Sequence, residues 1–372
     1  METPARARVL LRFDGDLDGL GDGDTAAVDR LRRELSACVQ DRDGNLWLGT
    51  DELTGLSRLN AEAPGLFGGH AFTDLAGLLS LPDGDEEIDI EGMDLAGDQL
   101  WLAGSHTSTR KKAKSKRSAA KNLRRLTEVR LRPNRCLIAR ARIDNGRLAR
   151  GPDGSLDVAQ LPMTPKGNPL LAALRDDPHL GPFMCPGDRA RRDRCAQIAS
   201  KENGFDIEGV AVHGDRLFLG LRGPVLRGWA LFLELEVTDA GDGRLCLQPI
   251  GAGGRPYRKH FVELGGMGIR DLVWRGDDLL LLAGPTMDIT GLQSVYRFHD
   301  AADLDDDSLS AMDGDRLSLA YHLPLMTGGD KAEGLCLFSG LDSPGLLVVY
   351  DAPRAERLVA ADSVLADLFE LP

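Results

Sequence analysis

The sequence predicts an all-β fold, a β-propeller of five four-stranded blades, with six blades as the alternative. The main observation is a phrase that recurs with variations: an apolar strand, a turn containing Gly or Asp, and a second apolar strand. It occurs as LSACVQDRDGNLWLG, IEGMDLAGDQLWLAG, IEGVAVHGDRLFLG, IRDLVWRGDDLLLLAG and AEGLCLFSGLDSPGLLVVY. A single β-hairpin cannot bury both of its faces, so its repetition indicates a radial arrangement of hairpins. We therefore expect one propeller domain over residues 1–372.

Composition supports a globular protein and excludes a membrane-spanning one. Hydrophobic residues make up 42% of the chain and charged residues 28%. No stretch approaches the ~20 consecutive apolar residues of a membrane span, and we expect no membrane partner. The N-terminal sequence METPARARVLLRF lacks the apolar core and cleavage site of a signal peptide. These observations predict a cytoplasmic protein.

The first two blades follow from alternating apolar runs. For blade one we expect strands at Leu35–Gln40, Asn45–Thr50, Leu53–Leu59 and Ala71–Leu75. For blade two we expect Ile88–Leu95, Gln99–Ser105, Arg135–Ile143 and Leu156–Leu161, interrupted by a basic insertion at residues 110–135. Residues 162–204 are rich in Pro and charge and lack the alternating pattern, which predicts a loop excursion with a short helical piece at Asn168–Leu174.

The last three blades complete the predicted ring. Blade three is expected at Phe205–Val212, Arg216–Arg222, Trp229–Val237 and Leu245–Ile250, and blade four at Gly268–Trp274, Asp278–Gly284, Ser294–Phe298 and Leu317–Leu323. Blade five has only three predicted strands, Ala332–Leu337, Gly345–Tyr350 and Arg357–Ala361. The N-terminal strand Val9–Phe13 can supply the fourth, which would close the ring and remove a free sheet edge.

Alignment of the hairpin turns brings charged residues to equivalent positions. Glu91, Glu208, Arg270 and Glu333 match one another at the start of the first strands, which line the channel of a propeller. The alternation of side chains along a strand places Asp89, Asp206 and Lys331 one step nearer the mouth. The ends of the second strands add Asp51, Ser105, His106, Arg222 and Asp288.

Two interpretations of this constellation remain open. Carboxylates that converge on one axis repel one another unless a cation lies among them, which predicts a divalent metal such as Ca²⁺ held by Glu91, Glu208 and Glu333. The alternative is a structural role, in which the glutamates brace neighbouring blades and Arg270 balances them in a buried salt bridge.

The sequence also predicts residues for chemistry at the mouth. On the enzymatic interpretation, Glu208 and Asp206 activate water and His106 moves a proton, although a plain loop histidine is the preferred interpretation of His106. The residues predicted to bind an anionic group are Arg222, Arg227, Arg270 and Lys331. The function predicted is that of a hydrolase-like or ligand-binding propeller that acts on an anionic small molecule of the phosphate-ester or lactone class.

The basic insertion offers an alternative function. Residues 110–135 contain twelve Lys or Arg and one Glu, a net charge of +11 in a chain of net charge −13. Such a segment attracts nucleic acid, but it contains no aromatic residue for stacking on single strands, and a solvated lid is the preferred interpretation. The alternative to a hydrolase is a non-catalytic interaction propeller that docks a protein partner.

Two further segments are candidates for a metal site or a disulfide. The turn DGDLDGLGDGD after Phe13 lacks the spacing and the closing Glu of an EF-hand, which disfavours calcium there. Cys185 and Cys195 flank a charged loop and could form a disulfide or a metal pair, with reduced thiols preferred for a cytosolic protein. The chain has no Walker loop, GxSxG elbow, HExxH helix or nucleotide-binding glycine pattern.

Two segments carry a resemblance to known families. DIEGVAVHGDRLFLGLRGPVLRGWA (Asp206–Ala230) and KAEGLCLF (Lys331–Phe338) resemble an uncharacterised bacterial family of domains of unknown function, with GLRGP the most specific part. More distantly, the Glu-Gly strands look like those of esterase-like phytases and other Ca²⁺-dependent propeller hydrolases. That likeness implies metal-assisted hydrolysis, with axial ligands matching Glu91, Glu208 and Glu333. Arg270 in the ring and the lack of axial Asn ligands depart from the pattern.

Overall fold

Five antiparallel hairpins form the inside of the molecule in the computed structural model, which describes residues 2–15, 25–51, 53–84, 86–184, 197–325 and 328–372. They are β2 (Leu35–Gln40) with β3 (Leu46–Thr50), β6 (Ile90–Ala96) with β7 (Gln99–Gly104), β13 (Asp206–His213) with β14 (Arg216–Leu226), β18 (Gly268–Arg275) with β19 (Asp278–Gly284), and β23 (Lys331–Phe338) with β24 (Gly345–Asp351). Turn glycines such as Gly97 and Gly214 have positive φ, +68° and +61°, which favours glycine at these tight connections.

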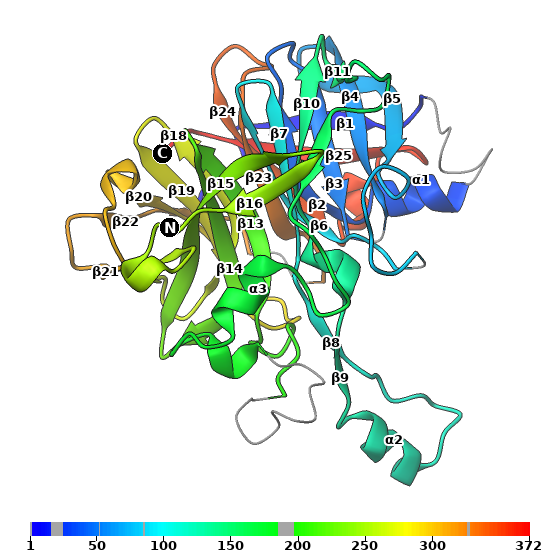
Figure 1. The fold of residues 1–372 in the computed structure, drawn as a ribbon. Helices are drawn as coiled ribbons and strands as arrows, with labels where there is room; N and C mark the ends of the chain where they lie inside the picture. The colour runs from blue at the N-terminus through cyan, green and yellow to red at the C-terminus, as the bar shows by residue number, and fades with distance from the viewer. Residues whose placement is uncertain (1, 16–24, 52, 85, 185–196, 326–327) are drawn as a thin grey trace.

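The first strands of these hairpins surround a common axis. Strands β2, β6, β13, β18 and β23 contact one another in a closed cycle. Further strands extend each hairpin outward: β4 (Gly55–Ala63) and β5 (Leu66–Asp74), β10 (Ile138–Asp144) and β12 (Val158–Gln160), β15 (Trp229–Gly241) and β16 (Arg244–Leu247), β20 (Ser294–Phe298) and β22 (Leu317–His322), and β25 (Ser363–Phe369) and β1 (Ala7–Arg12). The fold is therefore mostly β and propeller-like, as the sequence predicts (Figure 1).

The ends of the chain meet in one sheet. Strand β1 pairs antiparallel with β25, from Ala7 opposite Leu368 to Arg12 opposite Ser363. This confirms that the N-terminal strand completes the last sheet (Figure 1). The third strand of that sheet was wrongly predicted at Arg357–Ala361, because η6 (Ala355–Arg357) occupies its beginning and the strand lies further along the chain.

Other outer elements depart from the predicted pattern. Strand β17 (Arg258–Glu263), which was not predicted, pairs with the first half of β15, while β16 pairs with the second half. The remaining short elements are β11 (Arg147–Leu148), β21 (Ser308–Ser310), α1 (Thr25–Leu31), η1 (Pro133–Cys136), η2 (Gly181–Phe183), η4 (Ala252–Gly254) and η5 (Ala301–Asp303). Within the described ranges, no helix has both the length and the apolar character needed to cross a bilayer.

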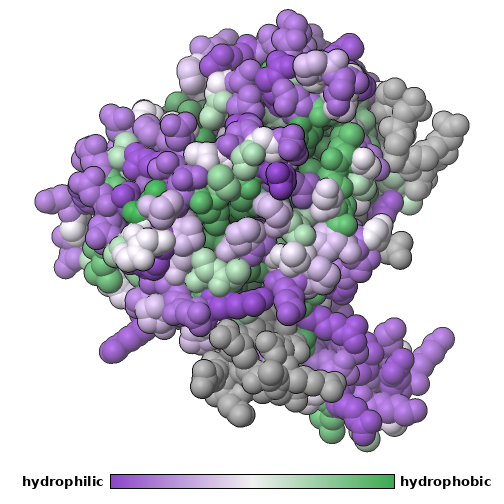
Figure 2. All heavy atoms as spheres, viewed as in Figure 1, coloured by the Kyte–Doolittle hydropathy of each residue, from purple (hydrophilic) through white to green (hydrophobic). Residues whose placement is uncertain are grey.

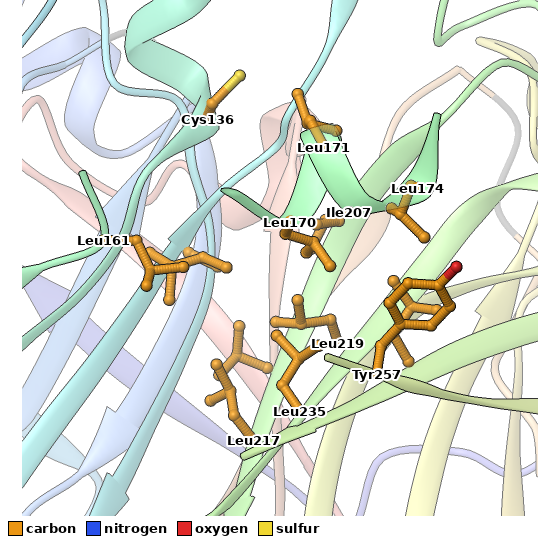
Figure 3. Close-up of a cluster of buried hydrophobic side chains, with 14 of the residues drawn as sticks. Cys136, Leu161, Leu170, Leu171, Leu174, Ile207, Leu217, Leu219, Leu235 and Tyr257 are labelled. Carbon is orange, nitrogen blue, oxygen red and sulfur yellow. The ribbon is translucent and has the colours of Figure 1, made fainter. Parts of the chain in front are cut away.

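The hydrophobic core is divided between neighbouring sheets. Each hairpin with its outer strands forms one sheet, and each cluster of the core joins two consecutive sheets. Phe218 and Phe232 of the third sheet, for example, pack with Leu279 of the fourth sheet. The cluster between the second and third sheets is sealed by α3 (Pro169–Leu174), whose N-cap Asn168 accepts a hydrogen bond from the backbone N–H of Leu171. Leu170, Leu171 and Leu174 of this helix lie over Ile207, Leu219 and Tyr257 (Figure 3). The helical piece expected in the 162–204 excursion is therefore present and packs into the core.

The basic insertion forms an arm that projects from the body. It consists of β8 (Ser108–Arg110), α2 (Ala119–Arg125) and β9 (Val129–Leu131), with β8 and β9 paired at its root (Figure 1). No residue of α2 is buried, and the surface of the arm is mostly hydrophilic (Figure 2). The arm leaves the body beside the mouth that is described next.

Candidate functional site

A β-bulge occurs at the same place in each inner strand. In every hairpin the pairing register skips one residue near the start of the first strand. Such a bulge leaves the extra residue unpaired and re-aims its side chain. The skipped residues are Ser36, Glu91, Glu208, Arg270 and Glu333, so the bulges explain why the four charged residues share one position. All four line the same hollow at the mouth of the ring.

The residue after the bulge is glycine in three strands because the neighbouring inner strand lies very close. A Cβ at Gly92 would lie 2.7 Å from the backbone N of Val210, and one at Gly209 would lie 2.8 Å from the Cα of Asp271. The repeated Glu-Gly pair therefore combines two requirements: glycine permits the approach of the next strand, and glutamate reaches the mouth.

Two of the ring glutamates are neutralised by arginines. Glu208 Oε1 lies 2.5 Å from Arg222 Nη1, and Glu208 Oε2 lies 2.9 Å from Arg270 Nε. Arg270 Nη2 also donates to Glu333. Glu208 and Glu333 are thus ion-paired with arginine, as in the structural alternative, while their role as metal ligands stays a prediction. Arg222 and Arg270 line the hollow, but their partners are carboxylates of the protein.

The aspartates nearer the mouth have arginine partners as well. Arg222 Nη2 donates to Asp206, and Arg135 Nη1 donates to Asp89 Oδ2 at 2.6 Å. Burial raises the pKa of Asp206 to about 7, against the lowering effect of Arg222. Ser105 also donates to Asp89, so this aspartate is held by a hydroxyl and a guanidinium. Asp206 is therefore oriented by Arg222, a geometry that suits a structural ion pair.

Glu91 has no such partner. The residue as a whole is 8% exposed and lines the hollow, yet among the described residues its side chain makes no hydrogen bond and no ion pair within 4.0 Å. One carboxylate oxygen each from Asp51, Asp89 and Glu91 can be chosen so that all three lie within 4.8 Å of one another. Asp51 Oδ1 is also buried without a hydrogen-bond partner. This acidic triad presents the oxygen ligands that a hard divalent cation prefers.

The electrostatics of the acidic triad are those of three close carboxyl groups of which only Asp89 has an arginine partner. Burial raises the pKa of Glu91 well above its usual range, and Asp89 and Asp51 raise it further. Burial likewise raises the pKa of Asp51, with added repulsion from Glu333 and Asp89. A cation among these groups would favour their ionised forms, so its binding would release protons.

The acidic triad lies where two lobes of the hollow meet. Asp51, Glu91, Lys201, Arg222 and Asp288 line both lobes. The first lobe is bordered by the loops that follow β19 and β22 and encloses about 670 Å³, including open solvent. The second lobe is bordered by the root of the arm and encloses about 1340 Å³ on the same basis.

Lys201 was not predicted from the sequence. Its side chain is exposed at the junction of the lobes and forms no ion pair within 4.0 Å among the described residues. Burial and Arg222 act to lower its pKa, but Asp288, Asp51 and Glu91 raise it overall. Its one sequence signal is its place just before the inner strand that begins at Asp206, within a segment of irregular pattern.

Of the residues predicted to bind an anion, Lys331 lies in the hollow and Arg227 does not. Lys331 lines the first lobe and pairs with Asp288 Oδ1 at 2.7 Å, with Asp351 Oδ2 at 3.6 Å. Arg227 is exposed in the turn between β14 and β15 at φ +51° and lines neither lobe. The structure therefore places Arg227 outside the site, because β14 carries it beyond the mouth.

His106 is also outside the hollow. It is 2% exposed, with Nδ1 2.7 Å from the carbonyl of Gly104 and Nε2 2.8 Å from Nδ2 of Asn168. Burial lowers its pKa to about 4. Because Nδ1 donates to a carbonyl and Nε2 accepts from an amide, the ring is neutral and both nitrogens are occupied. His106 thus links β7 to the N-cap of α3, in keeping with a structural histidine, and its proton-transfer role stays a prediction.

Two sequence hypotheses lie outside the described residues. Cys185 and Cys195, and the acidic turn at residues 16–24, belong to these segments. Of the described cysteines, Cys38, Cys136, Cys246 and Cys336 are free thiols.

The fold and the site define a propeller-like β protein with an acidic, partly arginine-balanced mouth. The chain belongs to the family described as Protein of unknown function (DUF3616), whose pattern matches residues 34–367. The resemblance to a family of domains of unknown function is thus confirmed. A search of curated proteins finds no match.

Several solved structures share the general arrangement of strands. An aldose sugar dehydrogenase from Streptomyces coelicolor is 10% identical, with 99% of each chain covered and a TM-score of 0.36. Virginiamycin B lyase from Staphylococcus aureus is 11% identical, with 98% of this chain and 99% of that chain covered and a TM-score of 0.35. Regucalcin from Agrobacterium tumefaciens, a calcium-binding protein, is 10% identical, with 92% and 94% covered and a TM-score of 0.33. Likeness at this level carries no information about the residues of the site.

Proposed function

We propose that the protein binds a divalent cation through the acidic triad and acts on an anionic small molecule in the hollow beside it. The reaction class is metal-assisted hydrolysis of a phosphate ester or lactone. The observation that carries the proposal is Glu91, a residue 8% exposed overall, whose carboxylate faces two other carboxylates and has no cationic partner within 4.0 Å among the described residues.

The charge balance of the mouth favours the binding of a cation. Three guanidinium groups, from Arg135, Arg222 and Arg270, face six carboxyl groups, from Asp51, Asp89, Glu91, Asp206, Glu208 and Glu333. Buried charges of one sign are costly unless they are paired or coordinate a metal. The excess negative charge is greatest at the acidic triad, where Arg135 alone faces three carboxyl groups, whereas Arg222 and Arg270 together face the other three.

The surroundings of the acidic triad supply the remaining requirements. A bound divalent cation polarises a phosphoryl or carbonyl oxygen and lowers the pKa of a water molecule. Lys201 lines the same lobes and carries a positive charge that no described carboxylate neutralises within ion-pair distance, so it is suited to hold the anionic group of the substrate. Lys331 lines the first lobe as a second cation, already shared with Asp288.

We also infer that the ring has five blades. Five inner strands contact one another in a closed cycle, and each begins a hairpin with the same bulge.

The test is metal analysis combined with thermal unfolding. We expect stoichiometric divalent metal in the purified protein, or a rise in Tm when Ca²⁺ or Mn²⁺ is added after EDTA treatment. Glu91→Gln should remove this response, whereas Glu356→Gln, at an exposed glutamate away from the mouth, should keep it. Absence of metal and of any cation-dependent shift in the unmodified protein would overturn the proposal.

The arm favours a second candidate function, docking to an acidic partner. Lys114, Lys116, Arg117, Lys121 and Arg124 are exposed and make no ion pair among the described residues. The helix is tied to its loop by Asn122, which exchanges two hydrogen bonds of 3.0 Å with the backbone of Lys114, so these cations are presented outward.

Charge removal in the arm tests this candidate. Replacing the four cations Lys114, Lys116, Arg117 and Lys121 by Ser should weaken binding of poly-glutamate and of duplex DNA at low salt while leaving the cation response at the mouth unchanged. Equal binding of either probe by the variant and the unmodified protein would remove docking through the arm.

A further inference from the structure

The first lobe has an apolar wall that the proposed function does not use. Met287, Ile289 and Leu325 are large apolar side chains with exposed fractions of 48%, 55% and 47%. All three line this lobe together with Pro285 and Pro324. Exposed apolar groups gathered in one hollow beside polar groups are typical of a ligand site.

Contacts on both sides hold this wall in place. Met287 forms a β-bridge with Glu202, which precedes the third inner strand. Asp288, between Met287 and Ile289, pairs with Lys331. The end of the loop is fixed by the amide of Gln293, which donates to the carbonyl of Ala332 at 2.7 Å and accepts from its N–H at 2.9 Å. Met287 and Ile289 are thus presented to the hollow by an anchored loop, and Leu325 comes from the loop after β22.

The apolar wall and the polar end of the hollow share one lobe. Asp51, Glu91 and Lys201 line the first lobe on the side where it meets the second, and Met287 and Ile289 line it too. A molecule bound there has an anionic or carbonyl head at the acidic triad and Lys201, and its remainder lies against apolar side chains. A small hydrophilic anion would leave this wall exposed to water.

We infer, resting on the proposed function, that the substrate is amphipathic: an oxygen-bearing head group that the cation polarises, joined to an aliphatic chain that lies on Met287, Ile289 and Leu325. Alkyl phosphate esters and alkyl-substituted lactones share this chemistry. Because burial of one methylene is worth ~0.8 kcal/mol, each methylene that contacts the wall should tighten binding about three- to fourfold.

Two ligand series distinguish the head groups. Binding of methyl, butyl and octyl phosphate, and of γ-lactones with methyl, butyl and hexyl substituents, is measured by calorimetry with Mn²⁺ present. We expect affinity to rise with chain length in one series, which identifies the head group. The double variant Met287→Ser and Ile289→Ser should flatten that dependence. Leu309→Ser, at a leucine 64% exposed in β21 that lines neither lobe, should keep it.

Different results would overturn the apolar subsite and the proposed cation site. Affinities independent of chain length in both series, or equal slopes in the double variant and the unmodified protein, would overturn the apolar subsite even if Mn²⁺ binds. Mn²⁺ binding is measured alone in a separate titration. Its absence would overturn the proposed function, while a chain-length dependence that Met287 and Ile289 control would still support the amphipathic ligand.

Discussion

Replacing Glu91 by Gln should stabilise the cation-free protein and remove its stabilisation by divalent cations. Carboxylate oxygens of the acidic triad lie within 4.8 Å of one another. At an effective dielectric constant of ~20, two unit charges at that distance repel by about 3.5 kcal/mol. Glu91 takes part in two of the three pairs, so it accounts for about 7 kcal/mol in a fully ionised triad.

The gain in stability that Glu91→Gln produces should be smaller than this repulsion energy, because protons partly neutralise the acidic triad when no cation is bound. Burial raises the pKa of Glu91 and of Asp51, so the cation-free site keeps protons that relieve part of the repulsion. What Gln removes is then only the repulsion with Asp51 and Asp89 that the protons do not already relieve, about 1–3 kcal/mol, less than one fully ionised pair. With an unfolding entropy of ~2.1 cal/mol/K per residue, a chain of 372 residues gains about 1–4 °C in Tm.

The assay is thermal unfolding at pH 8, in EDTA and with Ca²⁺ or Mn²⁺. At a cation concentration of about 100 times Kd, the unmodified protein should gain ~2.7 kcal/mol, or about 3 °C, and Glu91→Gln should gain nothing. Glu208→Gln provides the contrast, because it leaves Arg222 and Arg270 short of a counter-charge. Breaking such a buried pair costs ~3–5 kcal/mol, a fall of about 4–6 °C.

The two variants are expected to change Tm in opposite directions. If Glu91→Gln lowers Tm as Glu208→Gln does, and cations leave the unmodified protein unchanged, then Glu91 braces the ring and the acidic triad holds no metal.

Three other predictions follow from the same geometry. Because burial raises the pKa of Glu91, the protonated carboxyl stabilises the cation-free protein at acid pH, and this stabilisation is lost as the pH rises. Mn²⁺ should therefore raise Tm more at pH 8 than at pH 5. Equal shifts of Tm at the two pH values in thermal scans would contradict this. Lys201→Gln should weaken inorganic phosphate binding about tenfold in calorimetry without changing Mn²⁺ affinity, and a loss of both would assign it to the metal site. His106→Gln should destabilise the protein by ~1–3 kcal/mol in denaturant, since Asn168 and Gly104 lose a partner, while phosphate affinity stays the same.

The ring positions could be predicted because the turn and the bulge keep a constant spacing in each hairpin. Counting back from Gly97, Gly214 and Gly276 gave equivalent residues without knowledge of the bulge. Strict alternation of side chains counted from the turn would not have placed the ring residues on the correct face, because the bulge shifts the pleat by one residue at these positions. Closure by the N-terminal strand was predictable as well, because the last sheet lacked a strand and an unassigned one was available.

The partners of the ring residues were harder to predict. Arg222 reaches Glu208 from the end of a second strand, and Arg135 reaches Asp89 from the start of a third. Such pairings depend on side-chain lengths and strand stagger, which a sequence pattern does not contain. Lys201 belongs to a segment without periodicity, so only the three-dimensional course of the chain places it at the site.

The order of residues around the ring explains why Glu91 is the carboxylate left without a counter-charge. Arg270 stands between Glu208 and Glu333 and pairs with both. Glu91 stands between Ser36, a neutral residue, and Glu208, whose two oxygens already face Arg222 and Arg270. The negative charge that arginines do not balance is therefore greatest on the side where the first repeat meets the second, and there the first repeat contributes another acid, Asp51. A divalent cation at this place would do electrostatically what Arg270 does across the ring, and unlike a guanidinium it keeps coordination positions free for water and substrate.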